Sequence, residues 1–560
     1  MAKAKIAKFK ASKKSFKKAS GVLMTSKLAS EPASLSGTLS SGSTRKNVKS
    51  PKVKETALKS QLQALVLSQL MSQAAAEQEK KSHAVESKSV IYENLSIPSF
   101  EMLHLEQFHL EQKLNGHIVL EFSGLLPEEG KDQVIYYTQV GYQVQVKYKV
   151  GKKAKEEKMF QGIVTDVKVT NQGNLRYLYV TAHSNTIQLD ALKNSCSFQE
   201  QGMTYKAMIN KVLKRTTKAS AVFDGKADKA IGDFTLQYRE TDWEFAKRMA
   251  GRLNLPLIPE MTGDSPKFYF GCQFGSKAET VNIKEYSLSK NIKEYSIDSK
   301  NYISDIQEKD YISYDIVSYD IKKVGDAVKF KENEFYVIEA VYEMEEGIVF
   351  GKYKLARKNH FKRKKYHNLQ ISGISINGAV TEIQRDKLKV QLSIDNESNA
   401  KYVFPYSTMS ASPDGSGWYC MPQNGDLVRV YFPDEEEKNC FAISSVSSYS
   451  PEGGGSDKMS DPNVRYLRTP DNKEITLTPD GIVINADDGK AVITLDKDGS
   501  ITINGSKNIT VTAENDITIN AANNISMYAS ENISIKGSGG EITMEKSGDT
   551  KITGEYVLEN

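Results

Sequence analysis

An apolar position recurs every eight residues near the C-terminal end of the chain. Each unit places one apolar residue before and one after a Thr or Ser. This alternation predicts one short β-strand with a single apolar face. Asn or Asp opens successive units, at Asn508, Asp516, Asn524 and Asn532, where these side chains favour turns. The apolar positions are Ile493, Leu495, Ile501, Ile503, Ile509, Val511, Ile517, Ile519, Ile525, Met527, Ile533 and Ile535.

A short fixed period predicts a β-helix or solenoid. One ribbon of such strands offers only a thin apolar stripe and leaves its hydrogen-bonding edges open. Three intertwined copies would bury the stripes on a threefold axis and pair the edges between chains. We therefore expect residues 466–560 to form an intertwined trimeric β-helix needle. The alternative is a left-handed β-helix made by a single chain.

The N-terminal pattern is different. Residues 1–55 are rich in Lys, Ser and Ala and contain only two acidic residues, so they predict a basic disordered tail. Such an arm suits docking to a partner better than specific binding of nucleic acid, because few aromatic residues are interleaved. Residues 56–87 predict an amphipathic helix, which packs either on its own protein or on a partner or cargo.

Alternating strands dominate the region that follows, and residues 88–200 predict a small β-barrel. The expected strands are 114–122, 143–149, 162–170 and 177–182. The tetrapeptide HLEQ occurs twice, and its side chains could be considered as metal ligands: His104, Glu106, His109 and Glu111. Their spacing is not that of a zinc protease, so a surface strand or loop is the preferred interpretation.

Residues 201–265 predict helices. The first covers 205–215, and the second begins after Thr241, which is an N-cap with Glu244 at the capping-box position. Asn254 and Pro256 end this second helix. Residues 266–360 return to strands and predict a second β-barrel.

A repeated hexapeptide, NIKEYS, stands at 282–287 and again at 291–296 within the second barrel. Because only two copies exist, we interpret it as a local duplication in a hairpin or loop. Beyond the barrel, residues 358–367 predict a basic linker, 368–449 a five-stranded OB-type barrel, and 450–465 a Gly/Ser/Pro linker.

Composition and motifs limit the kinds of functional site that this sequence could form. The 560 residues are 39% hydrophobic and 26% charged, which fits about three or four soluble domains. The chain has no Walker loop, GxSxG or HExxH motif. The segment 496–499 resembles the start of a calcium loop, but a turn between strands explains it better. We expect the acidic residues 128–129 and 435–437 to lie in solvated loops, and the four cysteines to be reduced.

The order of these parts resembles a known family. Residues 238–245 (YRETDWEF), followed by Arg248 and by LIP at 257–259, resemble the helix motif of baseplate hub proteins. Residues 324–328 and 351–355 resemble the closing strands of a second hub barrel, and 421–426 an OB domain. The chain is thus similar to VgrG-like spike proteins of type VI secretion, and to phage late control D hub proteins fused to a baseplate-V OB domain. The motif residues are Tyr238, Arg239, Asp242, Trp243 and Phe245.

The resemblance implies a fold that is mainly β. It comprises two hub β-barrels with a helical insertion, an OB-fold and a C-terminal intertwined trimeric needle, after a disordered and helical N-terminal extension. It implies a homotrimer that joins a hexameric tail tube protein to a membrane-piercing needle and delivers cargo by mechanical puncture. Expected partners are baseplate proteins, a PAAR-type tip protein, an effector or adaptor at residues 1–87, and the target membrane on firing.

We expect no enzyme activity, cofactor, metal or specific nucleic acid. The protein would be cytoplasmic during assembly and would leave the cell as part of the injection particle. The alternative function is a trimeric tail spike that binds or degrades cell-surface polysaccharide. A secreted trimeric adhesin is disfavoured, because no signal peptide is evident at the start of the sequence.

Overall fold

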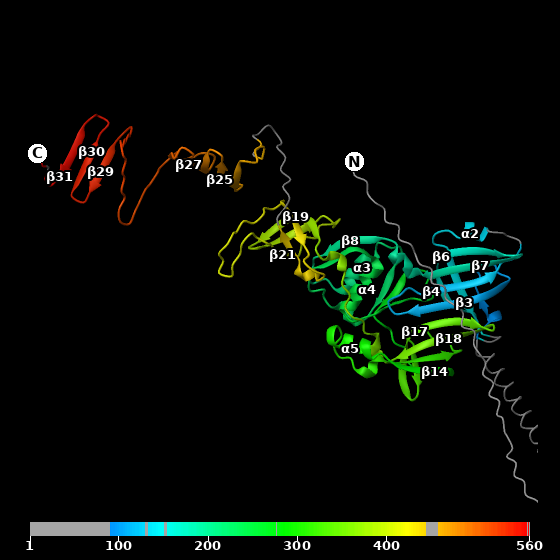
Figure 1. The fold of residues 1–560 in the computed structure, drawn as a ribbon. Coiled ribbons are helices and arrows are strands. Elements are labelled where there is room, and N and C mark those ends of the chain that lie inside the picture. Colours follow the sequence, from blue (N-terminus) through cyan, green and yellow to red (C-terminus); the bar gives the residue numbers. More distant parts are fainter. Residues whose placement is uncertain are drawn as a thin grey trace, which may run out of the picture. The chain divides into compact units, whose positions relative to one another are not determined.

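The computed structural model describes residues 90–128, 133–150, 154–275, 277–443, 457, 459–556 and 558. The chain divides into two compact units, Met1–Ser445 and Val446–Asn560 (Figure 1). The predicted tail, the amphipathic helix at 56–87 and residues 450–456 of the predicted linker lie outside the described residues. No helix among the described residues has the length and apolar character that a membrane crossing needs.

One continuous sheet of 13 strands forms the framework of the first unit. Its strands are β1 (Val90–Ile91), β2 (Leu95–Ser96), β3 (His104–Lys113), β4 (Val119–Leu125), β5 (Gln143–Tyr148), β6 (Glu157–Gln172), β7 (Leu175–Ser184), β13 (Glu279–Thr280), β14 (Ile283–Lys290), β15 (Ile312–Ser318), β16 (Ala327–Phe330), β17 (Asn333–Glu345) and β18 (Ile348–Ala356). The two predicted barrel regions are joined where β3 pairs with β17, with Leu110 opposite Tyr342.

Most of the predicted strands of the first region are confirmed. Residues 143–149, 162–170 and 177–182 correspond to β5, β6 and β7. The predicted strand 114–122 is wrong at its start, because the chain turns between β3 and β4 with Asn115 at a φ of 65°. The HLEQ repeat forms β3, in agreement with the preferred strand interpretation.

The largely apolar core of this sheet contains two buried phenols. Tyr342 and Tyr353 are almost fully buried, and their ring centroids lie 5.9 Å apart. Each hydroxyl donates to a backbone carbonyl, of Lys322 and Asp320 respectively. The polar atoms are therefore satisfied, as burial requires.

Two helices with short strands form the helical part of this unit. They are α3 (Tyr205–Leu213) and α4 (Asp242–Arg252), beside β8 (Lys193–Phe198), β9 (Ser220–Phe223), β10 (Thr235–Thr241), β11 (Leu257–Pro259) and β12 (Lys267–Phe270). The predicted capping box is confirmed: the Glu244 amide donates to Thr241 Oγ1 at 3.0 Å, and the Thr241 amide donates to Glu244 Oε2 at 2.9 Å. Asn254, at a φ of 55°, follows the helix end.

The two NIKEYS copies fold differently. The first lies mostly in β14, which pairs antiparallel with β15. The second lies in α5 (Ile292–Asn301), capped by Asn291, whose Oδ1 accepts from the Glu294 amide at 3.1 Å. The prediction of a hairpin or loop is therefore wrong for the second copy. Identical local propensity is overridden here by the partner strand available to one copy and the cap formed by the other.

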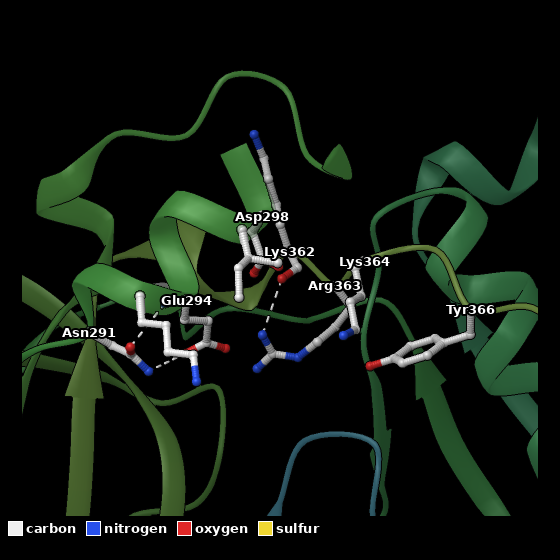
Figure 2. A pocket seen from close by; sticks show the side chains of 9 residues that line it. Asn291, Glu294, Asp298, Lys362, Arg363, Lys364 and Tyr366 are labelled. Atoms are coloured by element: carbon white, nitrogen blue, oxygen red, sulfur yellow. Dashed lines mark hydrogen bonds between the residues drawn. The ribbon is translucent and has the colours of Figure 1, made fainter. Parts of the chain in front are cut away.

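The segment predicted as a basic linker is packed. Residues Lys358–Phe361 form a 3-10 turn with Phe361 buried against the large sheet. Arg363 donates to the backbone carbonyls of His360 and Lys362 and points toward α5 (Figure 2). The linker prediction is wrong for these residues, because one apolar ring and one arginine hold the segment in place.

A five-stranded sheet follows, in the order β21-β20-β19-β22-β23. Its strands are β19 (Ser375–Gln384), β20 (Lys387–Leu392), β21 (Val403–Pro405), β22 (Leu427–Tyr431) and β23 (Phe441–Ile443). Tyr406, just after β21, bridges to Ala442 in β23, which links the two edges of the sheet as closure of a small barrel requires. The strand number agrees with the predicted OB-fold, which stays a prediction.

The second unit contains two antiparallel sheets. The first is a meander of β24 (Arg465–Arg468), β25 (Lys473–Thr478), β26 (Gly481–Ala486), β27 (Ala491–Asp496) and β28 (Ile501–Gly505). The second contains β29 (Ile533–Gly537), β30 (Gly540–Met544) and β31 (Thr550–Gly554). Residues 506–532, all of them described, form no helix or strand. The single chain thus shows a meander over 465–505 where a β-helix was expected.

Candidate functional site

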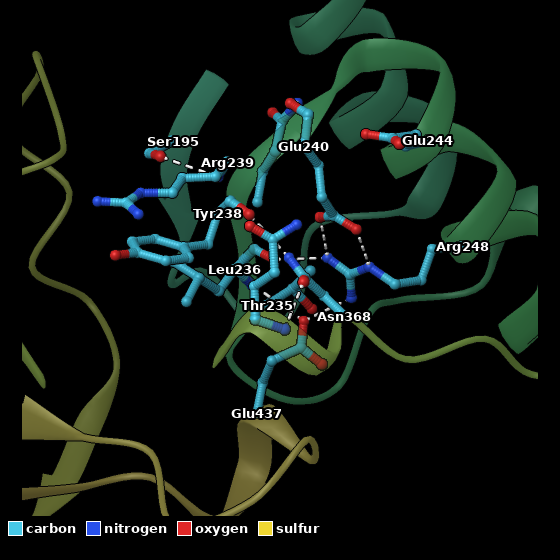
Figure 3. A network of polar contacts seen from close by, with 12 residues as sticks. Ser195, Thr235, Leu236, Tyr238, Arg239, Glu240, Glu244, Arg248, Asn368 and Glu437 are labelled. Carbon is cyan, nitrogen blue, oxygen red and sulfur yellow. Dashed lines mark hydrogen bonds and ion pairs between the residues drawn. The ribbon is translucent and has the colours of Figure 1, made fainter. Parts of the chain in front are cut away.

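The motif helix α4 is held by a buried arginine. Arg248 has 4% of its side chain exposed and donates from Nε and Nη2 to both carboxylate oxygens of Glu240, each at 2.7 Å (Figure 3). Nη2 also donates to the Leu236 carbonyl at 2.6 Å, and Nη1 to Glu437 Oε1 at 2.7 Å. A planar guanidinium suits this bidentate arrangement, which fixes α4 to β10 and to the segment before β23.

Glu437 is the acidic residue that the sequence interpretation misplaced. It was expected in a solvated loop, yet it is 4% exposed and pairs with both Arg248 and Arg252. Burial raises the pKa of its carboxyl, but the two guanidinium groups outweigh burial and hold the pKa below its ordinary value. The expectation of a solvated Glu437 fails because only the folded chain brings the two arginines to its carboxylate.

The motif residue Tyr238 faces the five-stranded sheet of residues 375–443, and Arg239 follows it at the surface. Tyr238 packs against its apolar core, and the Tyr238 carbonyl accepts from Asn368 Nδ2 at 2.8 Å. Arg239 is exposed, with a φ of 49° and its guanidinium carbon 5.3 Å from the centre of the Tyr238 ring. Its amide donates to Ser195 Oγ at 3.1 Å. The bend at Arg239 turns Tyr238 toward the sheet.

Asp242 begins α4 as a buried acceptor. It is 3% exposed and accepts from Arg215 Nη1 at 2.8 Å, Gln237 Nε2 at 2.9 Å and Asn194 Nδ2 at 3.1 Å. All three contacts reach the same oxygen, Oδ1. A carboxylate in the first turn is also favoured by the helix dipole. Asp242 therefore orients α4 against α3 and β8.

The two aromatic motif residues complete the packing of α4. Trp243, 2% exposed, lies between the His117 ring at 4.7 Å and the Phe268 ring at 5.3 Å. Phe245 is fully buried and stacks on Phe198 with centroids 5.5 Å apart. All five motif residues thus lie around one helix start, and each has a positioning contact.

His117 is a member of this cluster that sequence reasoning missed. Its Nε2 lies 2.8 Å from Asp190 Oδ2, and its Nδ1 lies 2.8 Å from Thr186 Oγ1. Asp190 also accepts from the Thr241 hydroxyl. Carboxylate, imidazole and hydroxyl stand in the order of a nucleophilic triad, but Thr186 is only 1% exposed, so no substrate reaches it. The arrangement links the large sheet to the α4 cap, and no sequence spacing signals it.

The metal candidates are not brought together. His104, Glu106, His109 and Glu111 are spread along β3, and His109 pairs with Glu343 at 3.4 Å. Within the described ranges, no three His, Cys, Asp or Glu side chains are grouped so that they could hold a metal ion. The four cysteines are free. The Ser500 amide donates to Asp498 Oδ1 at 2.8 Å, which agrees with the turn interpretation of 496–499.

The predicted axial residues are largely exposed in the single chain. Ile493 and Leu495 are each 37% exposed, and the exposed fraction rises to 71% at Val511. Ile533 is half-buried. The other axial residues are exposed to a similar degree: Ile501, Ile503, Ile509, Ile517, Ile519, Ile525, Met527 and Ile535. Within the residues that the structure describes, no other surface of the chain covers this apolar row.

Comparisons with known proteins agree with the architecture. No family model and no curated protein matches the chain. A chain of the half-lidded Francisella PdpA–VgrG complex matches with a TM-score of 0.52 and 9% identity, over 78% of this chain and 92% of that one. The E. coli c3393 protein is a component of the type VI secretion system with structural similarity to the T4 tail proteins gp27 and gp5. It matches with a TM-score of 0.47 and 9% identity, over 62% of this chain and 98% of that one. A 43 kDa tail protein of Shewanella oneidensis prophage MuSo2 matches with a TM-score of 0.37 and 10% identity, over 50% of this chain and 99% of that one. The match to the PdpA–VgrG complex shows that the chain has a VgrG-like fold, as the sequence resemblance implied.

Proposed function

We propose that three copies of this chain form a structural hub-and-spike protein of a contractile injection machine. The observation that carries the proposal is the exposed apolar row at eight-residue spacing in the second unit. Apolar surface of this extent is unusual on a soluble monomer and marks an interaction site. Three copies around one axis would bury it, and the VgrG-like fold supports the same assignment.

The backbone of residues 506–532 adds a second reason. These residues are described but form no strand in the single chain, although their apolar and polar positions alternate as in a strand. Strands of neighbouring copies would supply the missing hydrogen-bond partners. A rod cross-linked in this way resists unfolding along its axis, which suits a needle driven through an envelope by sheath contraction.

The large sheet fits a hub with a hexameric tail tube as partner. The β3–β17 pairing joins two similarly sized strand regions in one chain. Three copies would present six such regions, matching a sixfold ring. Baseplate proteins, a PAAR-type tip protein and an effector or adaptor at residues 1–87 are the further proposed partners. In this proposal the protein has no catalytic role, is assembled in the cytoplasm, and reaches the target membrane on firing.

Deletion of the gene in a cell that makes the particle tests the proposal. Electron cryotomography should show loss of assembled contractile particles, and restoration by the wild-type chain but not by an Ile517→Asp chain. Normal particles in the deletion strain would contradict a hub role. Activity of the purified chain on surface polysaccharide would instead favour the tail-spike alternative.

A further inference from the structure

A cavity of about 230 Å³ lies between α5 and the packed segment that follows β18 (Figure 2). Cationic side chains dominate its lining: Lys293, Lys362, Arg363 and Lys364. Two carboxylates, of Glu294 and Asp298, lie on the α5 side. Figure 2 shows Arg363 extending toward α5, with Tyr366 directed to the same space. The excess of positive charge makes an anion the favoured occupant.

Arg363 has hydrogen-bonding capacity left over. Its Nη1 donates to the carbonyls of His360 at 3.0 Å and Lys362 at 3.1 Å. A guanidinium carries five N–H donors and keeps its charge in proteins. In the part of the chain that the structure describes, neither Nε nor Nη2 donates a hydrogen bond. Burial lowers the pKa of this guanidinium, and the nearby carboxylates of Glu294 and Asp298 oppose that shift without cancelling it.

The nearby carboxylates are already hydrogen-bonded elsewhere. Glu294 Oε2 accepts from Asn291 Nδ2 at 2.7 Å, and Asp298 Oδ2 accepts from the Tyr311 hydroxyl at 2.8 Å. In the part of the chain that the structure describes, neither forms an ion pair with Arg363. Lys362 Nζ lies 3.2 Å from the Asp305 carbonyl, a neutral partner that leaves its charge uncompensated.

We infer that this cavity binds one oxyanion, a phosphate or carboxylate group, through Nε and Nη2 of Arg363. Two parallel N–H donors match two oxygens of such a group, and a charge-assisted bidentate contact is stronger than a neutral one. Lys362 and Lys364 add positive potential. Glu294 and Asp298 limit the site to a single anionic group. The inference does not depend on the hub-and-spike proposal, because it concerns a cavity within one chain.

Titration of the full-length chain tests the site. Inorganic phosphate and [13C]acetate are each followed by the broadening of their own NMR signal, at constant ionic strength set with chloride. We expect saturable binding of one of these probes, with the affinity reduced about tenfold or more in Arg363→Gln. Arg357→Gln is the matched control, because Arg357 is exposed in the same segment and does not line the cavity, so it should bind as the wild type does.

Substitutions at two exposed residues, Glu294 and Lys364, test the site without disturbing the folded core. Glu294→Gln removes a repulsive charge and should tighten binding by about threefold or more, a gain that a damaged structure would not produce. Lys364→Gln should weaken binding. Saturation by phosphate alone identifies a phosphate site, and saturation by acetate alone identifies a site for acidic side chains. Absence of saturation with both probes, or equal affinities of Arg363→Gln and Arg357→Gln, would overturn the inference.

Discussion

Arg248 of α4 donates a hydrogen bond of 2.7 Å to Glu437, which lies 189 residues later in the chain. Both side chains are almost fully buried. Arg252 pairs with the same carboxylate, so one acid receives two guanidinium groups. The helical part and the 375–443 sheet are therefore joined by charge as well as by apolar packing, with Phe234 and Leu236 of the helical part entering the core of that sheet.

Removing the Glu437 charge should destabilise this junction. In Glu437→Gln the side chain keeps its size, but Arg248 and Arg252 lose a buried counter-ion. We expect the free energy of unfolding to fall by about 3 kcal/mol, the lower end for breaking a buried ion pair, because Glu240 still neutralises Arg248. Urea denaturation followed by tryptophan fluorescence measures the change.

Glu435→Gln is the control for this variant, since Glu435 lies two residues away and is only partly buried. Its effect should stay within about 0.5 kcal/mol, as for an ordinary surface substitution. Equal midpoints for Glu437→Gln and Glu435→Gln would show that the buried pair contributes nothing to stability.

The same carboxyl predicts a dependence of stability on pH. A carboxyl whose pKa is depressed by folding contributes stability that is fully present above its unfolded pKa of about 4.3 and is lost as pH falls through the folded pKa. Asp190 and Glu260 have depressed pKa values as well, so the difference between wild type and Glu437→Gln isolates this group. That difference should be constant above about pH 5 and shrink below pH 4. A difference that grows on acidification would contradict this direction.

The two NIKEYS copies offer a matched pair of substitutions. Asn291→Ala removes the α5 cap, which is worth about 1 kcal/mol, so amide exchange in α5 should quicken about fivefold. Asn282→Ala removes the same residue from the first copy, where the backbone amide rather than the side chain donates to Asp320 Oδ2 at 2.7 Å. Exchange in β14 should therefore remain unchanged. Hydrogen exchange with mass spectrometry distinguishes the two, and similar effects at both sites would refute a local cap.

Local signals predicted much of the fold. The Thr241 capping box needs only residues three positions apart, and the alternation of 143–149 is visible within one strand. The motif at 238–245 predicts the start of a helix, and α4 begins there. Its residues cluster at the α4 start, although the resemblance does not say what each side chain contacts.

Long-range contacts account for what the sequence did not predict. Glu437 lies among acidic residues that look solvated, and its burial depends on arginines nearly two hundred residues earlier. His117 has no motif, because Asp190 and Thr186 come from a different segment. The second NIKEYS copy shows the same limit: one hexapeptide has one propensity, and its surroundings select strand or helix.

The proposed trimeric spike requires the predicted axial residues, Ile517 among them, to lie at a threefold axis. In Ile517→Asp, three carboxylates would meet near that axis, and uncompensated buried charge is costly. In Thr518→Asp, the next residue along, the alternation directs the new charge to the outer face. Both variants add one negative charge to each chain at adjacent positions. They differ in whether the new side chain is predicted to point toward the axis or toward the outer face.

Light scattering of the purified full-length chain and of these two variants is the most direct measurement. If the spike is trimeric, the wild type and Thr518→Asp should have three times the chain mass of 62.4 kDa, and Ile517→Asp should lose the trimer. A monomeric wild type would contradict the trimeric spike. A trimeric Ile517→Asp chain would contradict the axial placement of Ile517.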